Sequence, residues 1–397
     1  MKFEYVLLGS VCNITSSKRI FAKEYKSSGI PFYRGKEIIE KHRGHPVSTE
    51  LFISRERFCE IKEKFGVPQI GDILLTSVGT LGVSWLVNET DFYFKDGNLT
   101  WLRCGNRLLS EYLYLWLNSP EAQRQIEAKC IGSTQKALTI ETLNKFQIAL
   151  PSVSEQARIC SMLYPILNKI ELNQKINQNL EQQAWAFFQD LFIDNPCPNW
   201  QEGTICDLGT VIGGSTPSKA KPEYYTDHGI AWVTPKDLSI NKSKFILHGE
   251  TDITELGLKN SSATIMPKGT VLFSSRAPIG YIAIAAGKIT TNQGFKSIVP
   301  NPEIGAAYVY YFLKHNLPII EGMASGSTFK EVSGSTMKSV PAVIPDAKTL
   351  AEFNAFCIPV FAQQQLLEEQ NRSSIALRDS MLPELMAGKI DVSTVQA

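Results

Sequence analysis

The most regular pattern of apolar and polar positions in this chain lies between Ile159 and Leu191. Apolar residues recur there at alternating spacings of four and three, which is the 3.5-residue period of a coiled-coil seam. Two asparagines occupy seam positions midway, where a buried amide lowers stability but fixes the register of a helix pair. The pattern predicts a long helix whose buried face is formed by Ile159, Leu163, Ile166, Ile170, Asn173, Asn177, Leu180, Ala184, Phe187 and Leu191.

A second, less regular helical pattern follows in residues 346–397. Asn371 takes the place that Asn177 holds in the first pattern, so we expect the two helices to pack on each other as an antiparallel pair. Two amphipathic helices on separate cores are the alternative. The expected buried positions of the second helix are Phe353, Val360, Leu367, Asn371, Met381 and Leu385.

Two prolines interrupt these patterns at equivalent places, Pro165 and Pro359. Proline breaks a helix unless it lies in the first turn. We therefore expect a short helix and a break in each stretch, followed by a long helix that runs in the first stretch from about Pro165 to Phe192.

The rest of the chain has a different pattern of short apolar or alternating runs. The runs GDILLTS at 71–77 and GTVLFSS at 269–275 are bounded by glycine, proline, asparagine and serine clusters, which is typical of strands and turns. The aromatic blocks YLYLWL at 112–117 and YVYYFL at 308–313 predict a helix within each region. The fold class expected is α+β, with strand-rich modules at 1–150 and 196–345.

These modules are two copies of one unit. LGSV at 8–11 matches LGTV at 208–211, and GSTQKA at 132–137 matches GSTFKE at 326–331. The separation of matching blocks falls from 200 to 194 residues in small steps along the chain, as loop-length differences between two copies would produce. The expected organisation is a module at 1–150, a helix at 151–195, a module at 196–345 and a helix at 346–397.

Composition narrows the class of protein only slightly. The 397 residues carry a net charge of +1, with 43% hydrophobic and 20% charged residues, as in an ordinary globular protein of two or three domains. No apolar run reaches the roughly 18 residues of a membrane span, and Met1–Leu8 does not resemble a secretory signal. Eight cysteines without a CxxC pair favour reduced thiols and a cytoplasmic location.

Sequence motifs of catalysis are missing. The chain contains no GxxxxGK[ST], GxSxG, HExxH or kinase signature. NPCP at Asn195–Pro198 lacks the aromatic residue of the NPPY motif of amino-methyltransferases, and His42 and His45 lack a third metal ligand. We expect no catalytic residue and no metal site on this chain.

Polar and basic turns, by contrast, occur at matching places in both copies. Arginine and lysine can pair with guanine and asparagine and glutamine with adenine, while serine and threonine commonly hold phosphates. Each residue alone could equally be a solvated turn residue, but the repeated set predicts DNA contact. The candidates are Lys18, Arg19, Arg34, Lys36, Ser77, Lys95, Asn98, Gln135 and Lys136 in the first copy, and Ser218, Lys219, Lys221, Tyr224, Thr234, Lys236, Ser275, Arg276, Asn292, Gln293 and Lys330 in the second.

The chain resembles the specificity subunit of type I restriction–modification enzymes over essentially its whole length. The passage GSTQKALTIETLNKFQIALPSVSEQARI at 132–159 is similar to that family's transition from a recognition domain to a helix. The segments GGSTPSKAKPEYYTDHGIAWVTPKDL at 213–238 and RAPIGYIAIAAGKITTNQGF at 276–295 are similar to its recognition domains.

The resemblance implies two target recognition domains joined by two long antiparallel helices. Each domain would read one half of an asymmetric two-part site in double-stranded DNA, and the helices would set the unread spacer. Two modification subunits, which methylate adenine N6, would dock on the helices, and restriction/translocase subunits would join to cut. Catalysis and the cofactors S-adenosylmethionine, ATP and Mg would belong to those partners.

The two copies also differ. The first has TSSKR and KDGN where the second has TPS and TNQGF, which predicts different half-sites. Thr349 and Leu350 replace Glu155 and Gln156 at the start of the second helix, so its contacts with a partner are not expected to be identical. The alternatives are a stand-alone diverged DNA methyltransferase or nuclease, or a repeat scaffold that binds protein, which the near-neutral charge permits.

Overall fold

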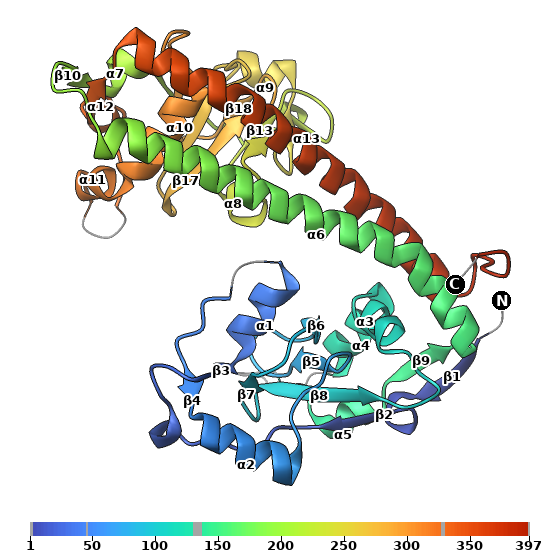
Figure 1. The fold of residues 1–397 in the computed structure, drawn as a ribbon. Coiled ribbons are helices and arrows are strands. Elements are labelled where there is room, and N and C mark those ends of the chain that lie inside the picture. The colour runs from blue at the N-terminus through green and yellow to red at the C-terminus, as the bar shows by residue number, and fades with distance from the viewer. Residues whose placement is uncertain (1–2, 45–46, 130–136, 327–329, 396–397) are drawn as a thin grey trace. The chain divides into compact units, whose positions relative to one another are not determined.

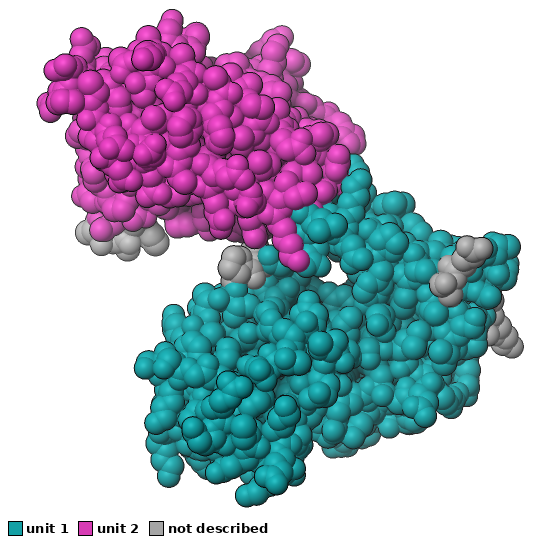
Figure 2. Space-filling model, in the orientation of Figure 1, with its two compact units in different colours: residues 1–172, 371–397 teal, residues 173–370 magenta. Residues whose placement is uncertain are grey.

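The computed structural model describes residues 3–44, 47–129, 137–326 and 330–395. Contacts between residues divide the chain into two compact units (Figure 2). Unit 1 comprises residues 1–172 and 371–397, and unit 2 comprises residues 173–370. Each unit therefore contains one of the two sequence copies together with part of both long helices (Figure 1).

Unit 1 is built on an antiparallel sheet with strand order β2-β8-β5-β6. A second sheet has the order β4-β3-β7, in which β3 and β7 are parallel, and β1 pairs with β9. The strands are β1 (Glu4–Leu7), β2 (Cys12–Thr15), β3 (Ile30–Tyr33), β4 (Phe52–Ile53), β5 (Ile73–Thr76), β6 (Ser84–Leu86), β7 (Tyr93–Phe94), β8 (Leu99–Cys104) and β9 (Gln147–Leu150). The shorter helices are α1 (Gly35–His42), α2 (Arg55–Phe65), α3 (Ser110–Leu117), α4 (Pro120–Lys129) and α5 (Ile140–Asn144), with 3₁₀ turns at Leu8–Ser10 and Ala22–Glu24.

Unit 2 has the sheet order β11-β19-β16-β17-β14, whose first four strands repeat the order of unit 1. Separate pairs are β10 with β20, β12 with β15, and β13 with β18 in parallel. The strands are β10 (Gln201–Thr204), β11 (Gly209–Gly213), β12 (Tyr225–Thr226), β13 (Trp232–Val233), β14 (Phe245–Ile246), β15 (Asp252–Ile253), β16 (Val271–Ser275), β17 (Ile279–Ala285), β18 (Thr290–Thr291), β19 (Lys296–Pro300) and β20 (Pro341–Ile344). The shorter helices are α7 (Ile205–Leu208), α8 (Pro235–Ile240), α9 (Glu255–Lys259), α10 (Ala306–His315), α11 (Leu317–Gly322) and α12 (Gly334–Lys338), with a 3₁₀ turn at Pro222–Tyr224.

The backbone hydrogen bonds repeat between the units as well. The amide of Leu138 donates to the carbonyl of Ser77 at 2.9 Å, and the amide of Val332 donates to the carbonyl of Ser275 at 3.0 Å. Leu138 and Val332 follow the two GST motifs at the same distance in sequence. Each motif therefore precedes a segment that joins the same strand end, and the α+β fold class and the two-fold repeat are confirmed.

The long helices are α6 (Val153–Gln189) and α13 (Ala347–Met386). The expected breaks at Pro165 and Pro359 are wrong, because each proline lies inside a continuous helix. Both prolines face solvent, so the hydrogen bond that each removes is lost on the exposed side, while the buried face continues across them. After Gln189 the chain makes one π-helical turn, Asp190–Asp194.

The predicted seam is largely buried. Ile159, Leu163, Ile170, Asn173, Phe353, Val360, Leu367, Asn371 and Leu385 are buried, whereas Ile166, Asn177, Leu180, Phe187, Leu191 and Met381 are half-buried. Beyond Leu180 the fully buried positions are Ala184, Phe188 and Phe192. The buried positions therefore depart from the predicted spacing, because α6 packs there on α10 as well as on α13. The centre of the Phe188 ring lies 5.9 Å from that of Tyr308 in α10 and 5.9 Å from that of Phe353 in α13.

Polar contacts along the seam show that α6 and α13 pair antiparallel. In unit 1 the Asn371 side chain donates to the carbonyl of Ile170 at 3.3 Å. In unit 2 the Asn173 side chain donates to Gln370 at 3.3 Å, and Gln364 donates to the carbonyl of Asn177 at 3.2 Å. Later residues of α6 meet earlier residues of α13. The seam amides use glutamine and backbone partners, and two helices on separate cores are not observed.

A buried ion cluster joins both long helices to the rest of unit 2. The Lys244 side chain is 7% exposed and forms an ion pair with Glu181 of α6. Its ammonium group also donates to Gln364 of α13 at 2.7 Å and lies 4.2 Å from the centre of the Phe361 ring. Lys314 of α10 binds the other oxygen of Glu181 at 2.7 Å. This cluster connects α6, α10, α13 and the segment that carries Lys244.

The ion cluster predicts that the stability of unit 2 falls at acid pH. Burial alone would raise the pKa of Glu181, but the ammonium groups of Lys244 and Lys314 lower it to about 2. Because the folded-state pKa lies below the unfolded value of about 4.3, the contribution is fully present above that value and is lost as pH falls toward 2. Urea unfolding of the protein and of Glu181→Gln between pH 6 and pH 2.5 should show a smaller acid-induced loss in the variant, and parallel curves would contradict the assignment.

None of the helices within the described ranges combines the length and apolar composition needed to cross a bilayer. The described cysteines are all free thiols.

Candidate nucleic-acid interface

In both units, a pair of parallel strands ends beside the start of a short helix. The carbonyl of Tyr33 at the end of β3 accepts a hydrogen bond from the amide of Lys95 at 2.8 Å. In unit 2 the carbonyl of Val233 at the end of β13 accepts one from the amide of Asn292 at 3.0 Å. Because parallel strands present their carboxyl ends at one edge, the segments that follow them lie close together.

Unit 2 forms a cavity of about 310 Å³ at this edge. Five of the residues predicted to contact DNA line it, and they come from three segments that are far apart in sequence. A tryptophan and two acidic residues also face the cavity. The lining residues are Thr216, Lys219, Trp232, Thr234, Lys236, Asp237, Glu250, Thr251, Asn292 and Gln293.

The side of the cavity at α8 is held by a capping box. The Thr234 hydroxyl and amide each donate to one oxygen of Asp237 at 2.7 Å. The other carboxylate oxygen of Asp237 accepts from the amide of Glu250 at 2.9 Å. A capping box satisfies backbone donors at a helix start, so Thr234 and Asp237 fix this side of the cavity.

The segment with Lys219 is anchored by aromatic residues. The buried indole of Trp232 donates to the carbonyl of Ser215 at 3.0 Å, and the Tyr225 hydroxyl donates to the carbonyl of Pro217 at 2.6 Å. The amide of Ser215 donates to the carbonyl of Thr291 at 2.9 Å. A Cβ atom at Gly214 would lie 1.9 Å from the carbonyl oxygen of Asn292, so this close approach requires glycine.

The cavity combines both signs of charge with neutral amides. Lys236 and Glu250 form an exposed ion pair at 2.7 Å, which raises the pKa of Lys236. Exposed pairs of this kind are worth little, so either partner can exchange its contact for a ligand. The amides of Asn292 and Gln293 add further donors and acceptors to the lining. This chemistry suits hydrogen bonding to base edges and phosphates.

Further polar contacts extend from the cavity toward the segment with Lys330 and Glu331. Gln293 contacts Thr216, and its carbonyl accepts from Lys296 at 3.3 Å. Glu331 then lies 3.6 Å from Lys296 and 3.5 Å from Arg276. Arg276 is half-buried, and Lys330, beside Glu331, is exposed. Arg276 therefore belongs to the same polar surface as the cavity.

The corresponding edge of unit 1 carries different side chains on the same backbone arrangement. The Arg34 amide donates to Glu37 at 2.7 Å, which caps α1 as Asp237 caps α8. Arg19 forms an ion pair with Asp96 at 2.7 Å, and the Lys18 ammonium lies 5.0 Å from the centre of the Phe65 ring. Lys36 is exposed, and Lys95 and Asn98 are half-buried.

Three of the predicted contacts need correction, because their side chains are buried within the fold. The Ser77 hydroxyl bonds to Leu75 and Thr100, and that of Ser275 bonds to the carbonyl of Gly294. Tyr224 is 5% exposed, and its hydroxyl accepts from the exposed Lys221 at 3.1 Å. These groups brace the turns that carry the other candidates. Ser218 is exposed, and Gln135 and Lys136 lie outside the described residues.

Trp232, Asp237 and Glu250 were not among the sequence candidates. The spacing of Thr234 and Asp237 matches a helix-capping signature, which could have identified Asp237. Nothing in the local sequence marks Glu250. Among the residues that the structure places, no three histidine, cysteine or acidic side chains gather as a metal site would require.

Comparison with known proteins decides the family. The family model described as "Type I restriction modification DNA specificity domain" matches residues 1–182 and 198–368. The chain belongs to this family. Each of the two matched ranges covers most or all of one sequence copy and runs on into the long helix that follows it.

Individual relatives agree with this assignment. The chain is 43% identical over 160 residues to the type I restriction enzyme MjaIX specificity subunit of Methanocaldococcus jannaschii, which covers 40% of this chain and 37% of that relative. It is 22% identical over 419 residues to the HindI specificity subunit of Haemophilus influenzae, which covers 84% of this chain and 91% of the relative. The crystal structure of a type I S subunit from M. genitalium superposes with a TM-score of 0.60 at 16% identity and covers 97% of this chain and 96% of that one. This last likeness shows the fold.

Proposed function

We propose that the chain is the non-catalytic DNA-recognition subunit of a type I restriction–modification complex. The observation that carries the proposal is the unit 2 cavity, where three distant polar segments meet within a domain of the specificity family. Unit 1 reads one half of a two-part site and unit 2 reads the other. Modification and restriction subunits supply the catalysis and bind S-adenosylmethionine, ATP and Mg.

The two edges support readout of different half-sites. Where unit 2 presents Thr234 and Asn292, unit 1 presents Arg34 and Lys95 on matching backbone positions. Arginine and lysine favour guanine, whereas asparagine favours adenine. The same scaffold with different side chains therefore reads an asymmetric site.

The long helices provide a docking surface for the modification subunits. Five apolar side chains on the two helices are 45–68% exposed. Exposed apolar side chains that gather on one element mark interaction sites. They are Leu172 and Ile176 of α6 and Ile358, Leu366 and Leu377 of α13.

A mobility shift on duplex DNA tests the proposal. The chain co-expressed with its methyltransferase subunit should select a two-part sequence from a random duplex pool. Because phosphate contacts release counterions, binding should weaken steeply with salt. A complex without sequence preference, whose binding barely changes between low and moderate salt, would contradict DNA recognition and favour a protein-binding scaffold.

The spacer prediction concerns the helix pair. Inserting seven residues both after Leu172 in α6 and after Gln370 in α13 lengthens the pair by about 10 Å at 1.5 Å per residue. A heptad keeps the seam in phase to within about 20°. The selected site should keep both half-sites, and the spacer between them should become longer by about three base pairs, at 3.4 Å each. An unchanged spacer, measured by selection from the same pool, would show that the helices do not set the spacing.

A further inference from the structure

Strands β2 and β8 of unit 1 place two cysteines directly opposite each other. Cys12 is paired with Cys104 in the antiparallel register. The next pair, Val11 and Gly105, is hydrogen-bonded, because the amide of Gly105 donates to the carbonyl of Val11 at 2.9 Å. Hydrogen-bonded and non-hydrogen-bonded pairs alternate along an antiparallel ladder, so Cys12 and Cys104 form a non-hydrogen-bonded pair.

That position suits a disulfide. Residues of a non-hydrogen-bonded pair have Cα atoms about 4.5 Å apart and side chains on the same face. Disulfides form at Cα separations of about 4.4–6.8 Å. Both cysteines are free thiols, and Cys12 is buried at the edge of the unit 1 core, against which Cys104 packs.

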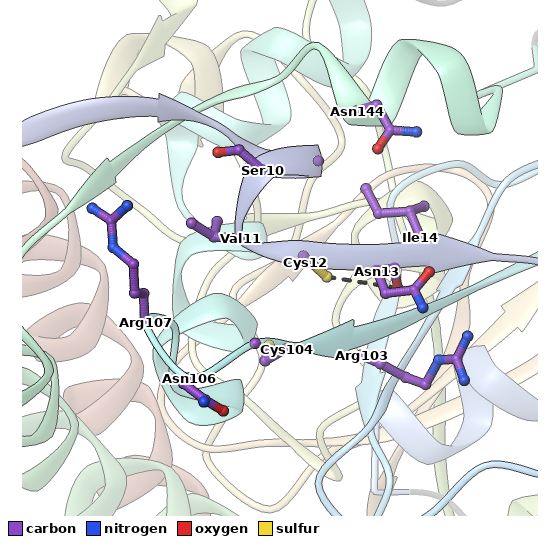
Figure 3. A pocket seen from close by; sticks show the side chains of 12 residues that line it. Ser10, Val11, Cys12, Asn13, Ile14, Arg103, Cys104, Asn106, Arg107 and Asn144 are labelled. Atoms are coloured by element: carbon purple, nitrogen blue, oxygen red, sulfur yellow. Dashed lines mark hydrogen bonds between the residues drawn. The ribbon is translucent and has the colours of Figure 1, made fainter.

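The pair is also open to a small molecule. Both cysteines line a pocket of about 720 Å³, together with Arg103 and Arg107 (Figure 3). The Arg103 guanidinium lies over the Trp101 ring at 4.3 Å, and Arg107 pairs with the exposed Glu4 at 3.1 Å. The Arg107 guanidinium favours an oxidant that bears a carboxylate.

We propose that Cys12 and Cys104 form a reversible disulfide when unit 1 meets a carboxylate-bearing low-molecular-weight disulfide such as oxidised glutathione. The Cys104 thiolate attacks one sulfur of the oxidant, forms a mixed disulfide and releases the first thiolate. Cys12 then loses its proton and attacks the Cys104 sulfur, which releases the second. The two protein thiols are oxidised, the oxidant is reduced to two thiols, and the two protons pass to these.

The electrostatics of the pair fit this order of attack. The neighbouring Cys12 thiol lowers the pKa of Cys104, whereas the same neighbour and burial raise the pKa of Cys12. The thiolate is the attacking species in thiol–disulfide exchange. Cys104 is also the more exposed of the two, so it is the entry point for the oxidant.

The site belongs to unit 1 alone, because β11 and β19 of unit 2 contain no cysteine. It also lies on the strands that carry part of the unit 1 edge. β2 leads into the segment with Lys18 and Arg19, and β8 follows the segment from Lys95 to Asn98. A disulfide would therefore cross-link the two strands at the end away from those segments.

Peptide mapping of the full chain after oxidised glutathione treatment tests the proposal. Free thiols are alkylated in denaturant, and the digest is analysed without reduction. We expect one linked peptide pair that joins Cys12 to Cys104, a mass lower by two hydrogens, and recovery of both thiols after dithiothreitol. Cys12→Ser should stop at a glutathionyl group on Cys104, Cys104→Ser should leave Cys12 free, and Cys59→Ser, which removes an exposed thiol, should still form the link.

Two results would overturn the proposal. One is that, in the chain without substitutions, Cys12 and Cys104 remain open to alkylation while the exposed Cys59 becomes glutathionylated. The other is that Cys104 accumulates the mixed disulfide and never transfers it to Cys12, which would show that the two sulfurs do not reach each other.

Discussion

Replacing Lys244 with methionine is expected to lower the free energy of unfolding of unit 2 by about 3 kcal/mol or more. The substitution keeps the apolar stem but removes the buried cation that Glu181 and Gln364 bind. Glu181, whose side chain is 23% exposed, then keeps only Lys314 as a cationic partner among the contacts of this cluster. Losing one member of a buried pair leaves an under-compensated charge. Hydrogen exchange of α10 and the adjoining part of α6, read by mass spectrometry under native conditions, measures this loss.

Lys314→Met provides a matched control on the same carboxylate. Lys314 binds Glu181 at 2.7 Å, but its side chain is 43% exposed, and water replaces such a contact at little cost. Its loss should be below about 1 kcal/mol. Equal losses for the two variants would show that the cluster is not held by the buried lysine.

Replacing Lys236 with glutamate should weaken binding at the unit 2 half-site and leave the other half-site unchanged. Lys236 lines the cavity and faces Glu250 at 2.7 Å, so the substitution places two carboxylates where DNA is expected. A lost base contact costs about 1–3 kcal/mol, or roughly 5- to 150-fold in affinity. Competition binding with duplexes mutated in one half-site at a time measures the effect.

The repeat supplies the controls for this experiment. Lys36→Glu makes the same change on the unit 1 edge and should weaken only the opposite half-site. Lys268→Glu alters an exposed lysine of unit 2 that does not line the cavity, and it should change neither. If Lys236→Glu weakened both half-sites equally, separate readout by the two units would be wrong.

The spacing of apolar residues predicted the buried face of α6 correctly in its first part and less well in its second. Between Ile159 and Leu180 the 3.5-residue period located Ile159, Leu163, Ile170 and Asn173, which are all buried. Beyond Leu180 a second partner, α10, widens the buried face, so Phe188 is buried and Phe187 is not. Tertiary packing of this kind leaves no trace in the local spacing. The continuous helix through Pro165 depends in the same way on contacts with other elements.

The candidate site was predicted only in part. Basic and amide residues in matching turns located Lys219, Lys236, Asn292 and Gln293, which the fold brings into one cavity. A polar residue at a strand end looks the same in sequence whether it faces solvent or a carbonyl of the core, and Ser275 is of the second kind. Glu250 lies in a segment without a repeated motif, so only the fold could bring it to the cavity.

The division of the chain into units has a consequence for the order in which the protein can fold during synthesis. The core of unit 1 contains Leu382, Leu385, Met386 and Val392 together with residues of the first recognition domain. Those residues leave the ribosome after the whole of unit 2, which is one uninterrupted stretch. The domain translated first is therefore completed last. Until the C-terminal part of α13 has been synthesised and packs on unit 1, part of the apolar core of unit 1 stays exposed to solvent.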